Sequence, residues 1–248
     1  MTDRSVLDRE ARWPDAVVRY GEHDDSLLDL HLPEDRTTAP LVVLIHGGFW
    51  RSQWDRRHTR PMAEGLSARG FIVATPEYRR TGGGGGWPAT FEDVRSAVEQ
   101  LPDLLDRVGL SYTQPRVVGH SAGGHLALWL ASQPVELERC VALAPVCDLG
   151  GAYERELDGG ATGALMGGSP DEHPERYDAG DPMRRSTGDV PVTILHGTAD
   201  MQVPLDLSRA YAETHPGTRL VELRRIDHFA LIDPESGAWP DVLEAVTG

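Results

Sequence analysis

The sequence of 248 residues contains no lysine, so all 24 of its Lys and Arg residues are arginines. Without lysine, the chain has no side chain for a Schiff base and no Walker-type phosphate loop. Its 39 acidic residues outnumber the arginines and leave a formal net charge of -15. This acidic balance argues against nucleic acid or an anionic membrane surface as a partner.

Cysteine and long apolar runs are also scarce. The two cysteines, Cys140 and Cys147, lie at the ends of one predicted strand, which would separate them by about 23 Å, too far for a disulfide. We expect both to be packing residues in a reducing compartment. No apolar run reaches the roughly 18 residues of a membrane-spanning helix. Residues 1–15 are charged and lack the apolar stretch of a signal peptide, which predicts a cytoplasmic protein.

From residue 41 onward, apolar runs typical of buried strands alternate with segments of helical spacing. This alternation predicts a single α/β domain over residues 1–248, with a mostly parallel central sheet and helices on both faces. Residues 16–21 and 26–33 precede it and predict an antiparallel hairpin. The expected strands are 39–48, 70–78, 115–121, 139–147, 190–200 and 218–227. The expected helices are 60–69, 90–108 (with Thr90 as N-cap), 124–133, 206–215 and 239–248.

One interval, residues 149–189, breaks this rhythm. It is rich in Gly, Asp, Pro and Glu and has no long periodic segment. Intervals of this length in a compact domain are usually functional or partly helical. We therefore predict a small insertion over the carboxyl edge of the sheet that acts as a lid or pocket wall.

A single serine lies between glycines at the point where a strand ends and a helix begins. In the stretch Val117–Leu128, VVGHSAGGHLAL, Gly119 and Gly123 flank Ser121 two residues away on each side. A strand-to-helix turn this sharp needs small neighbours and lifts the serine hydroxyl above the sheet edge. Because ligand sites in open α/β sheets lie along that edge, the pattern predicts Ser121 as a nucleophile.

A serine nucleophile needs a base, and the base needs an acid to orient it. His228 follows the last predicted strand, and Asp200 follows the strand before it, so both reach the same edge. The order Ser121, Asp200, His228 is that of hydrolases with this architecture. Asp227 adjoins the histidine and is the main rival acid, whereas Asp206 falls at a helix start.

The remaining requirement is a set of donors for the oxyanion. The stretch LIHGGFW ends a strand with two glycines, after which the N–H groups of Gly48 or Phe49 can turn inward and join that of Ala122. The expected substrate-pocket residues are Trp50, Trp54 and His120. We expect the other strand-end histidines, His46 and His196, to support neighbouring loops, and His125 to pack or bond locally. The acidic clusters within residues 154–178 lack His or Cys at ligand spacing, so neither metal nor cofactor is expected.

The motifs HGGFW, GHSAGGHLA, HGTAD and DHF together resemble the α/β-hydrolase superfamily, in its esterase, lipase and arylformamidase branch. The stretch PEYRRTGGGGGWPATFEDV is similar to the segment after the second buried strand in those enzymes, and the resemblance spans about residue 17 to the end. HGG followed by an aromatic residue and Trp50 is similar to kynurenine formamidases, which usually have Tyr in place of Phe49. Feruloyl-type esterases resemble the chain as well, whereas the hormone-sensitive-lipase branch has a third glycine there.

The resemblance implies an α/β-hydrolase fold and a metal-independent serine hydrolase that forms an acyl-enzyme. We expect a carboxylesterase that cleaves small carboxylic esters with an uncharged or cationic acyl portion. The alternatives are an arylformamidase acting on N-formylkynurenine, a prolyl-oligopeptidase-like peptidase, and a catalytically silent fold that serves as a binding module. The expected partner is a small-molecule ester or amide, and a homodimer is left open.

Overall fold

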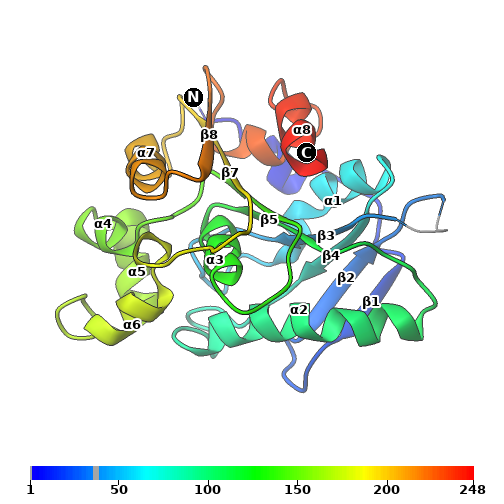
Figure 1. The fold of residues 1–248 in the computed structure, drawn as a ribbon, viewed down its shortest axis with the longest axis horizontal. Coiled ribbons are helices and arrows are strands. Elements are labelled where there is room, and N and C mark those ends of the chain that lie inside the picture. The colour runs from blue at the N-terminus through cyan, green and yellow to red at the C-terminus, as the bar shows by residue number, and fades with distance from the viewer. Residues whose placement is uncertain (1, 36–38) are drawn as a thin grey trace.

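The computed structural model describes residues 2–35 and 39–248. Its centre is an eight-stranded sheet in the order β1-β2-β4-β3-β5-β6-β7-β8 (Figure 1). The strands β1, β2 and β4 pair antiparallel, and all other neighbours are parallel, so the predicted hairpin and the predicted parallel sheet are both confirmed. The strands are β1 (Ala16–Arg19), β2 (Leu27–His31), β3 (Leu41–Ile45), β4 (Ile72–Pro76), β5 (Arg116–His120), β6 (Arg139–Leu143), β7 (Val192–Gly197) and β8 (Thr218–Leu223).

Helices cover both faces of this sheet, as the alternation predicted. One face packs against α1 (Arg60–Ser67) and α8 (Trp239–Thr247), together with the short 3-10 helices η1 (Ser5–Asp8) and η4 (Phe229–Ile232). The other face packs against α2 (Ala89–Arg107), α3 (Ala122–Ala131) and α7 (Leu205–Thr214). None of the helices in the described parts of the chain is both long and apolar enough to cross a bilayer.

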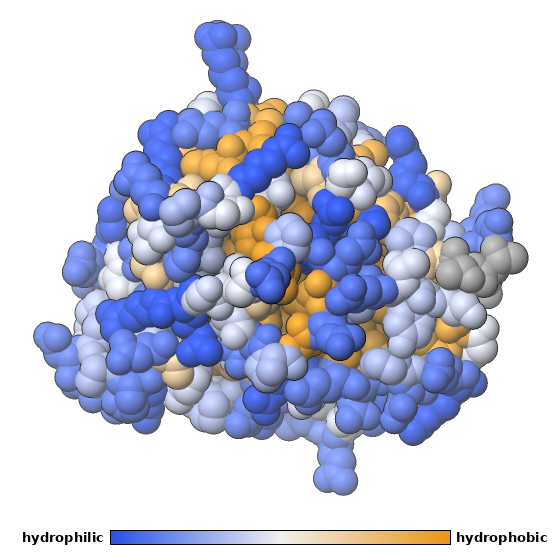
Figure 2. All heavy atoms as spheres, in the orientation of Figure 1, coloured by the Kyte–Doolittle hydropathy of each residue, from blue (hydrophilic) through white to orange (hydrophobic). Residues whose placement is uncertain are grey.

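Burial on all sides explains why the central strands and helix appear in the sequence as continuous apolar runs. Every residue of β3 and of β4 is buried, because helices cover both sides of these strands. All ten residues of α3 are buried as well, so this helix is apolar around most of its surface, with the buried ring of His125 as the exception. Figure 2 shows hydrophilic residues over most of one face of the molecule, with apolar residues gathered near its middle, around α3.

The interval 149–189 is helical in part. It forms α4 (Leu149–Glu154), α5 (Leu157–Met166), α6 (Pro174–Gly180) and the 3-10 helix η3 (Pro182–Arg184), gathered on one side of the sheet (Figure 1). The sequence concealed these helices because they are short, and because residues Asp158, Gly159 and Gly160 interrupt α5 with positive φ angles.

Two local predictions are corrected. Thr90 is not the N-cap of α2, because Pro88 occupies that position. The Thr90 hydroxyl instead accepts a hydrogen bond from Gly86 N and donates one to Arg79 O, which closes the glycine-rich loop before the helix. The strand predicted over 139–147 ends at Leu143, because the chain turns at Ala144, where φ is 44°.

A buried network of charges lies beneath the loops that follow β3 and β4. Asp29 on β2 is 1% exposed, and its carboxylate accepts hydrogen bonds from Arg56 Nε (2.7 Å) and Arg60 Nη2 (2.9 Å). Glu77, 2% exposed, accepts from Arg56 N (3.0 Å) and lies 2.8 Å from His46 Nε2. Burial would raise the pKa of Glu77, but His46 and Arg80 beside it lower that pKa to about 2. The network therefore holds the β3 loop by ionic contacts that water does not reach.

The variant Asp29→Ala is expected to lose about 3–5 kcal/mol of unfolding free energy, because it leaves the buried guanidinium of Arg56 without its principal partner. The control Glu99→Ala breaks an exposed pair with Arg95 in α2 and is expected to cost less than about 1 kcal/mol. Urea unfolding of the two variants compares them. Equal losses would contradict the structural role given to the buried network.

Candidate active site

The turn between β5 and α3 holds Ser121 in a strained conformation. Its φ and ψ are 57° and -119°, a region that residues with a Cβ rarely adopt. A Cβ on Gly119 would lie 2.1 Å from the carbonyl oxygen of Gly123, and a Cβ on Gly123 would lie 2.1 Å from that of Ile45. Both glycines are therefore required by the close approach of β3, β5 and α3.

His228 and Asp200 lie side by side, as the sequence predicted. His228 Nδ1 is 2.6 Å from Asp200 Oδ2, and both side chains are buried. A carboxylate only accepts hydrogen bonds, so the proton of the neutral imidazole lies on Nδ1 and leaves Nε2 as an acceptor. Asp200 Oδ1 accepts from the backbone N–H groups of Gln202 (2.7 Å) and Val203 (2.9 Å), which fixes the carboxylate.

The environment of Asp200 keeps its carboxyl group ionised. Burial alone would raise the pKa of Asp200, but hydrogen bonds from His196 and His228, together with that from Val203 N, hold this pKa well below its usual range. The ionised carboxylate is therefore available to orient His228 and to stabilise its imidazolium form.

The two rival carboxylates point elsewhere. Asp227 Oδ1 accepts from the N–H groups of Phe229 and Ala230, and its Oδ2 accepts from Asp3 N at 2.8 Å. Its side chain therefore binds the first two N–H groups of η4 and contacts the N-terminal segment. Asp206 lies in the first turn of α7 and pairs with Arg155. Of the three acids considered from the sequence, Asp200 is the one in contact with the His228 ring.

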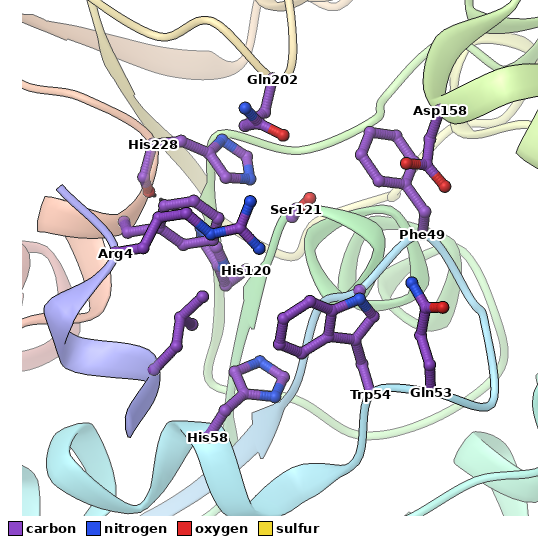
Figure 3. Close-up of a pocket in the computed structure, with 13 residues that line it drawn as sticks. Arg4, Phe49, Gln53, Trp54, His58, His120, Ser121, Asp158, Gln202 and His228 are labelled. Carbon is purple, nitrogen blue, oxygen red and sulfur yellow. Dashed lines mark hydrogen bonds between the residues drawn. The ribbon is translucent and has the colours of Figure 1, made fainter. Parts of the chain in front are cut away.

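Ser121 and His228 line one cavity of about 190 Å³. Figure 3 shows the Ser121 side chain at its centre, with the His228 ring beside it. No hydrogen bond joins the two side chains within the described residues; such contacts often tighten when a substrate binds. The cavity is lined by Arg4, Leu7, Gly48, Phe49, Gln53, Trp54, His58, His120, Ser121, Asp158, Gln202, His228 and Phe229.

Of the predicted pocket residues, Trp54 and His120 line this cavity and Trp50 does not. Trp50 is fully buried, its Nε1 donates to His125 Nδ1 at 3.2 Å, and its ring packs edge-on against the His125 ring. Its placement in the pocket was wrong, because the turn at Phe49 and Trp50, with φ of 48° and 56°, sends the indole into the core.

The backbone donors predicted for the oxyanion lie around Ser121. Gly48 and Phe49 line the same cavity, and Ala122 directly follows the serine at the start of α3. Gly48 has φ of 109°, and a Cβ there would lie 2.4 Å from Trp54 Cβ. The N–H groups of Gly48, Phe49 and Ala122 donate no hydrogen bond to any other described residue, so they remain available to a ligand.

Strand-end histidines support the loops around the cavity. His46 follows β3 and its Nδ1 lies 2.8 Å from Gly47 O, while His196 on β7 contacts Val203 O at 3.0 Å. His120 Nε2 lies 3.0 Å from His228 O, so it holds the backbone of the candidate base. Burial lowers the pKa of His120 well below its usual value, and His228 nearby adds to that shift.

Several cavity residues were missed from the sequence. Phe229 directly follows the predicted base, and Gln53 and His58 lie in the segment that follows HGGFW, so all three positions could have been found by extending the motifs. Asp158 comes from the interval 149–189, and Arg51 contacts its carboxylate at 2.5 Å and so ties α5 to the β3 loop. No sequence motif marks Arg4 as a cavity residue. The nearest feature is the apolar pair at positions 6–7, which lies in an otherwise charged segment. No group of three or more His, Cys, Asp or Glu residues in the described chain could hold a metal ion.

A family model described as BD-FAE matches residues 28–214. The chain belongs to this family. Among curated proteins, the esterase LipC of Mycobacterium tuberculosis is 25% identical over 248 residues, which cover 92% of this chain and 60% of LipC. Kynurenine formamidase of Salmo salar is 29% identical over 116 residues, which cover 46% of this chain and 37% of that protein. The chain thus spans less than two thirds of either relative.

A truncated carbohydrate esterase from gut microbiota has a solved structure similar to this one, with a TM-score of 0.81. The match covers 95% of this chain and 98% of the other at 18% sequence identity. It concerns the fold, and together with the family match it confirms the assignment to the α/β-hydrolase superfamily that the four motifs indicated.

The variant Gly48→Ala is expected to lose more stability than Gly70→Ala. Both glycines have positive φ, but a Cβ on Gly70 meets no atom within 4 Å, whereas one on Gly48 collides with Trp54. Gly70→Ala should cost about 1–2 kcal/mol for the backbone alone, and Gly48→Ala a further 1–3 kcal/mol or so for the clash. Urea unfolding measures both, and equal costs would show that Trp54 does not constrain this turn.

Proposed function

We propose that this chain is a carboxylesterase-type serine hydrolase that cleaves small carboxylic esters. The observation that carries the proposal is that Ser121, at the strained end of β5, shares one cavity with a histidine whose Nδ1 lies 2.6 Å from a buried carboxylate. Membership of the BD-FAE family and the similarity to esterase LipC support the same reaction class.

In the proposed reaction, Ser121 Oγ attacks the carbonyl carbon of the ester while His228 Nε2 accepts its proton. Asp200 holds the imidazole in the required tautomer and stabilises the imidazolium. The tetrahedral intermediate then collapses and the alcohol departs with the proton from His228. Water, activated by the same histidine, releases the acid from the acyl-enzyme.

The negative charge of both tetrahedral intermediates is stabilised by backbone donors. We assign this role to the N–H groups of Ala122 and of Gly48 or Phe49, which have no other described partner. The partial positive charge at the N-terminus of α3 lies beneath the same point and adds to the stabilisation. One such donor contributes about 3–4 kcal/mol to transition-state stabilisation.

The size of the cavity favours small substrates. Its volume of about 190 Å³ lies below the roughly 300–1,000 Å³ of sites that enclose drug-sized ligands. A second candidate, arylformamidase activity, is favoured by the similarity to kynurenine formamidase over 116 residues. In both reactions Ser121 would attack a carbonyl carbon with the help of His228. The two reactions differ in the leaving group, which is an alcohol for an ester and an amine for a formamide.

The variant Ser121→Ala is expected to lower kcat/KM at least about 10³-fold for any ester the protein hydrolyses. The assay compares short 4-nitrophenyl esters with N-formylkynurenine on wild type and variant. More than tenfold preference for the esters supports the esterase, and more than tenfold preference for the formamide supports the second candidate. Undiminished hydrolysis in Ser121→Ala, or failure of folded wild type to react with a fluorophosphonate, would contradict a serine hydrolase.

The variants Asp200→Asn and Asp227→Asn separate the two candidate acids. Asp200→Asn should lower kcat about 10⁴-fold, because an amide favours the wrong tautomer of His228. Asp227→Asn should stay within about threefold of wild type, because that side chain contacts backbone N–H groups and not the imidazole. Steady-state rates on one ester measure both. The reverse order of effects would assign the acid role to Asp227.

A further inference from the structure

An unpaired cation lies at the rim of the cavity. Arg4 lines the cavity that contains Ser121 and His228, and Figure 3 shows its guanidinium pointing into the same space as the serine. No ion pair or side-chain hydrogen bond between described residues includes this guanidinium. Its described contacts are with aromatic faces: Cζ lies 5.6 Å from the centroid of the Trp54 ring and 5.2 Å from that of Phe229. The charge is therefore positioned but not neutralised.

The N-terminal strap, residues 3–9, is built to hold Arg4 in this place. Val6 is 2% exposed and packs into the core beneath α1 and α8. Asp3 N donates to Asp227 Oδ2 at 2.8 Å, and the guanidinium of Arg9 makes a two-pronged contact with Asp233. These contacts attach the strap on both sides of Arg4, so they fix the backbone from which its side chain extends.

The other charged group of the cavity is already neutralised. Asp158 lies across the cavity from Arg4, beside Phe49 (Figure 3), and its carboxylate contacts Arg51 Nε at 2.5 Å. Burial lowers the pKa of both His58 and His120, so these two rings are neutral at pH 7. Among the described residues that line the cavity, Arg4 therefore carries the one charge without an oppositely charged partner, and that charge is positive.

From this arrangement we infer that Arg4 is a specificity-determining residue that binds an anionic group of the substrate. The inference rests on the proposed function and narrows it to esters that carry a carboxylate or similar anion near the scissile bond. An arginine guanidinium donates paired hydrogen bonds to a carboxylate. A neutral alkyl group of the substrate in the same place has no acceptor for these hydrogen bonds. The preferred substrates are thus opposite in charge to the expectation from the net charge of -15.

The anionic group can belong to the acid or to the alcohol, and two pairs of substrates distinguish these sources. The first pair is 4-nitrophenyl hydrogen glutarate and 4-nitrophenyl pentanoate, which differ by a carboxylate on the acyl side. The second is 4-(butyryloxy)benzoate and its methyl ester, which differ by a carboxylate on the leaving group. Wild type should show at least about tenfold higher kcat/KM for the anionic member of one pair.

The variant Arg4→Met removes the charge but keeps an unbranched side chain that packs on Trp54 and Phe229. It should lose that preference about tenfold or more, while kcat/KM for the neutral esters stays within about threefold. Arg4→Lys should retain part of the preference. The control Arg57→Met removes an equal charge from an exposed position whose partner is Asp55, outside the cavity lining, and should leave the preference unchanged.

The salt dependence of the preference for anionic esters provides a second test. Raising NaCl from 50 to 500 mM should weaken the preference in wild type and leave Arg4→Met unaffected, because Arg4 is solvent-exposed and its attraction is screened. Equal loss on neutral and anionic esters in Arg4→Met would make Arg4 a purely structural residue and overturn the inference. So would the absence of any charge preference in active wild type. Wild type that hydrolyses none of the esters would instead overturn the proposed function itself.

Discussion

The close approach of β3, β5 and α3 at two glycines is the constraint on which the site depends. Any side chain at Gly119 or Gly123 would overlap a backbone carbonyl, so the three elements meet without side chains between them. This contact forces the chain through the positive φ of Ser121 and directs the N-terminus of α3 at the serine. A Cβ on Gly47 would likewise lie 3.1 Å from Ser121 Cβ, so the β3 loop packs directly against the same turn.

Buried histidines extend this constraint to the surrounding loops. His46, His120 and His196 come from the carboxyl ends of three parallel strands, and each contacts a backbone carbonyl of a loop at the cavity. A ring in this position links a rigid strand to a loop that has no regular hydrogen bonds of its own. The loop that carries His228 is held in this way by His120, and the loop that carries Asp200 is held by His196.

The sequence was sufficient to predict those parts of the site that follow from strand order. Ser121, Asp200 and His228 each follow a buried apolar run, and parallel strands bring such positions to one edge. Trp50 could not be placed in the same way, because its direction depends on two consecutive positive φ angles that no residue type in HGGFW requires. The helices of 149–189 could not be predicted for a related reason. Glycines with positive φ interrupt α5, and they also interrupt the amphipathic period by which a helix is predicted.

The net charge of the chain and the charges inside the cavity lead to opposite expectations for the charge of the substrate. A net charge of -15 describes the average surface, and at physiological salt its influence decays over roughly 8 Å. Within the cavity, Asp158 is offset by Arg51, while the Arg4 guanidinium contacts the rings of Trp54 and Phe229 and forms no ion pair with any residue that the structure describes. The strap that holds Arg4 is also bound to Asp227 and Asp233, on either side of His228 and η4. The segment that carries Arg4 and the segment that carries His228 are therefore in direct contact, so the geometry of the fold fixes the cation and the candidate base relative to one another.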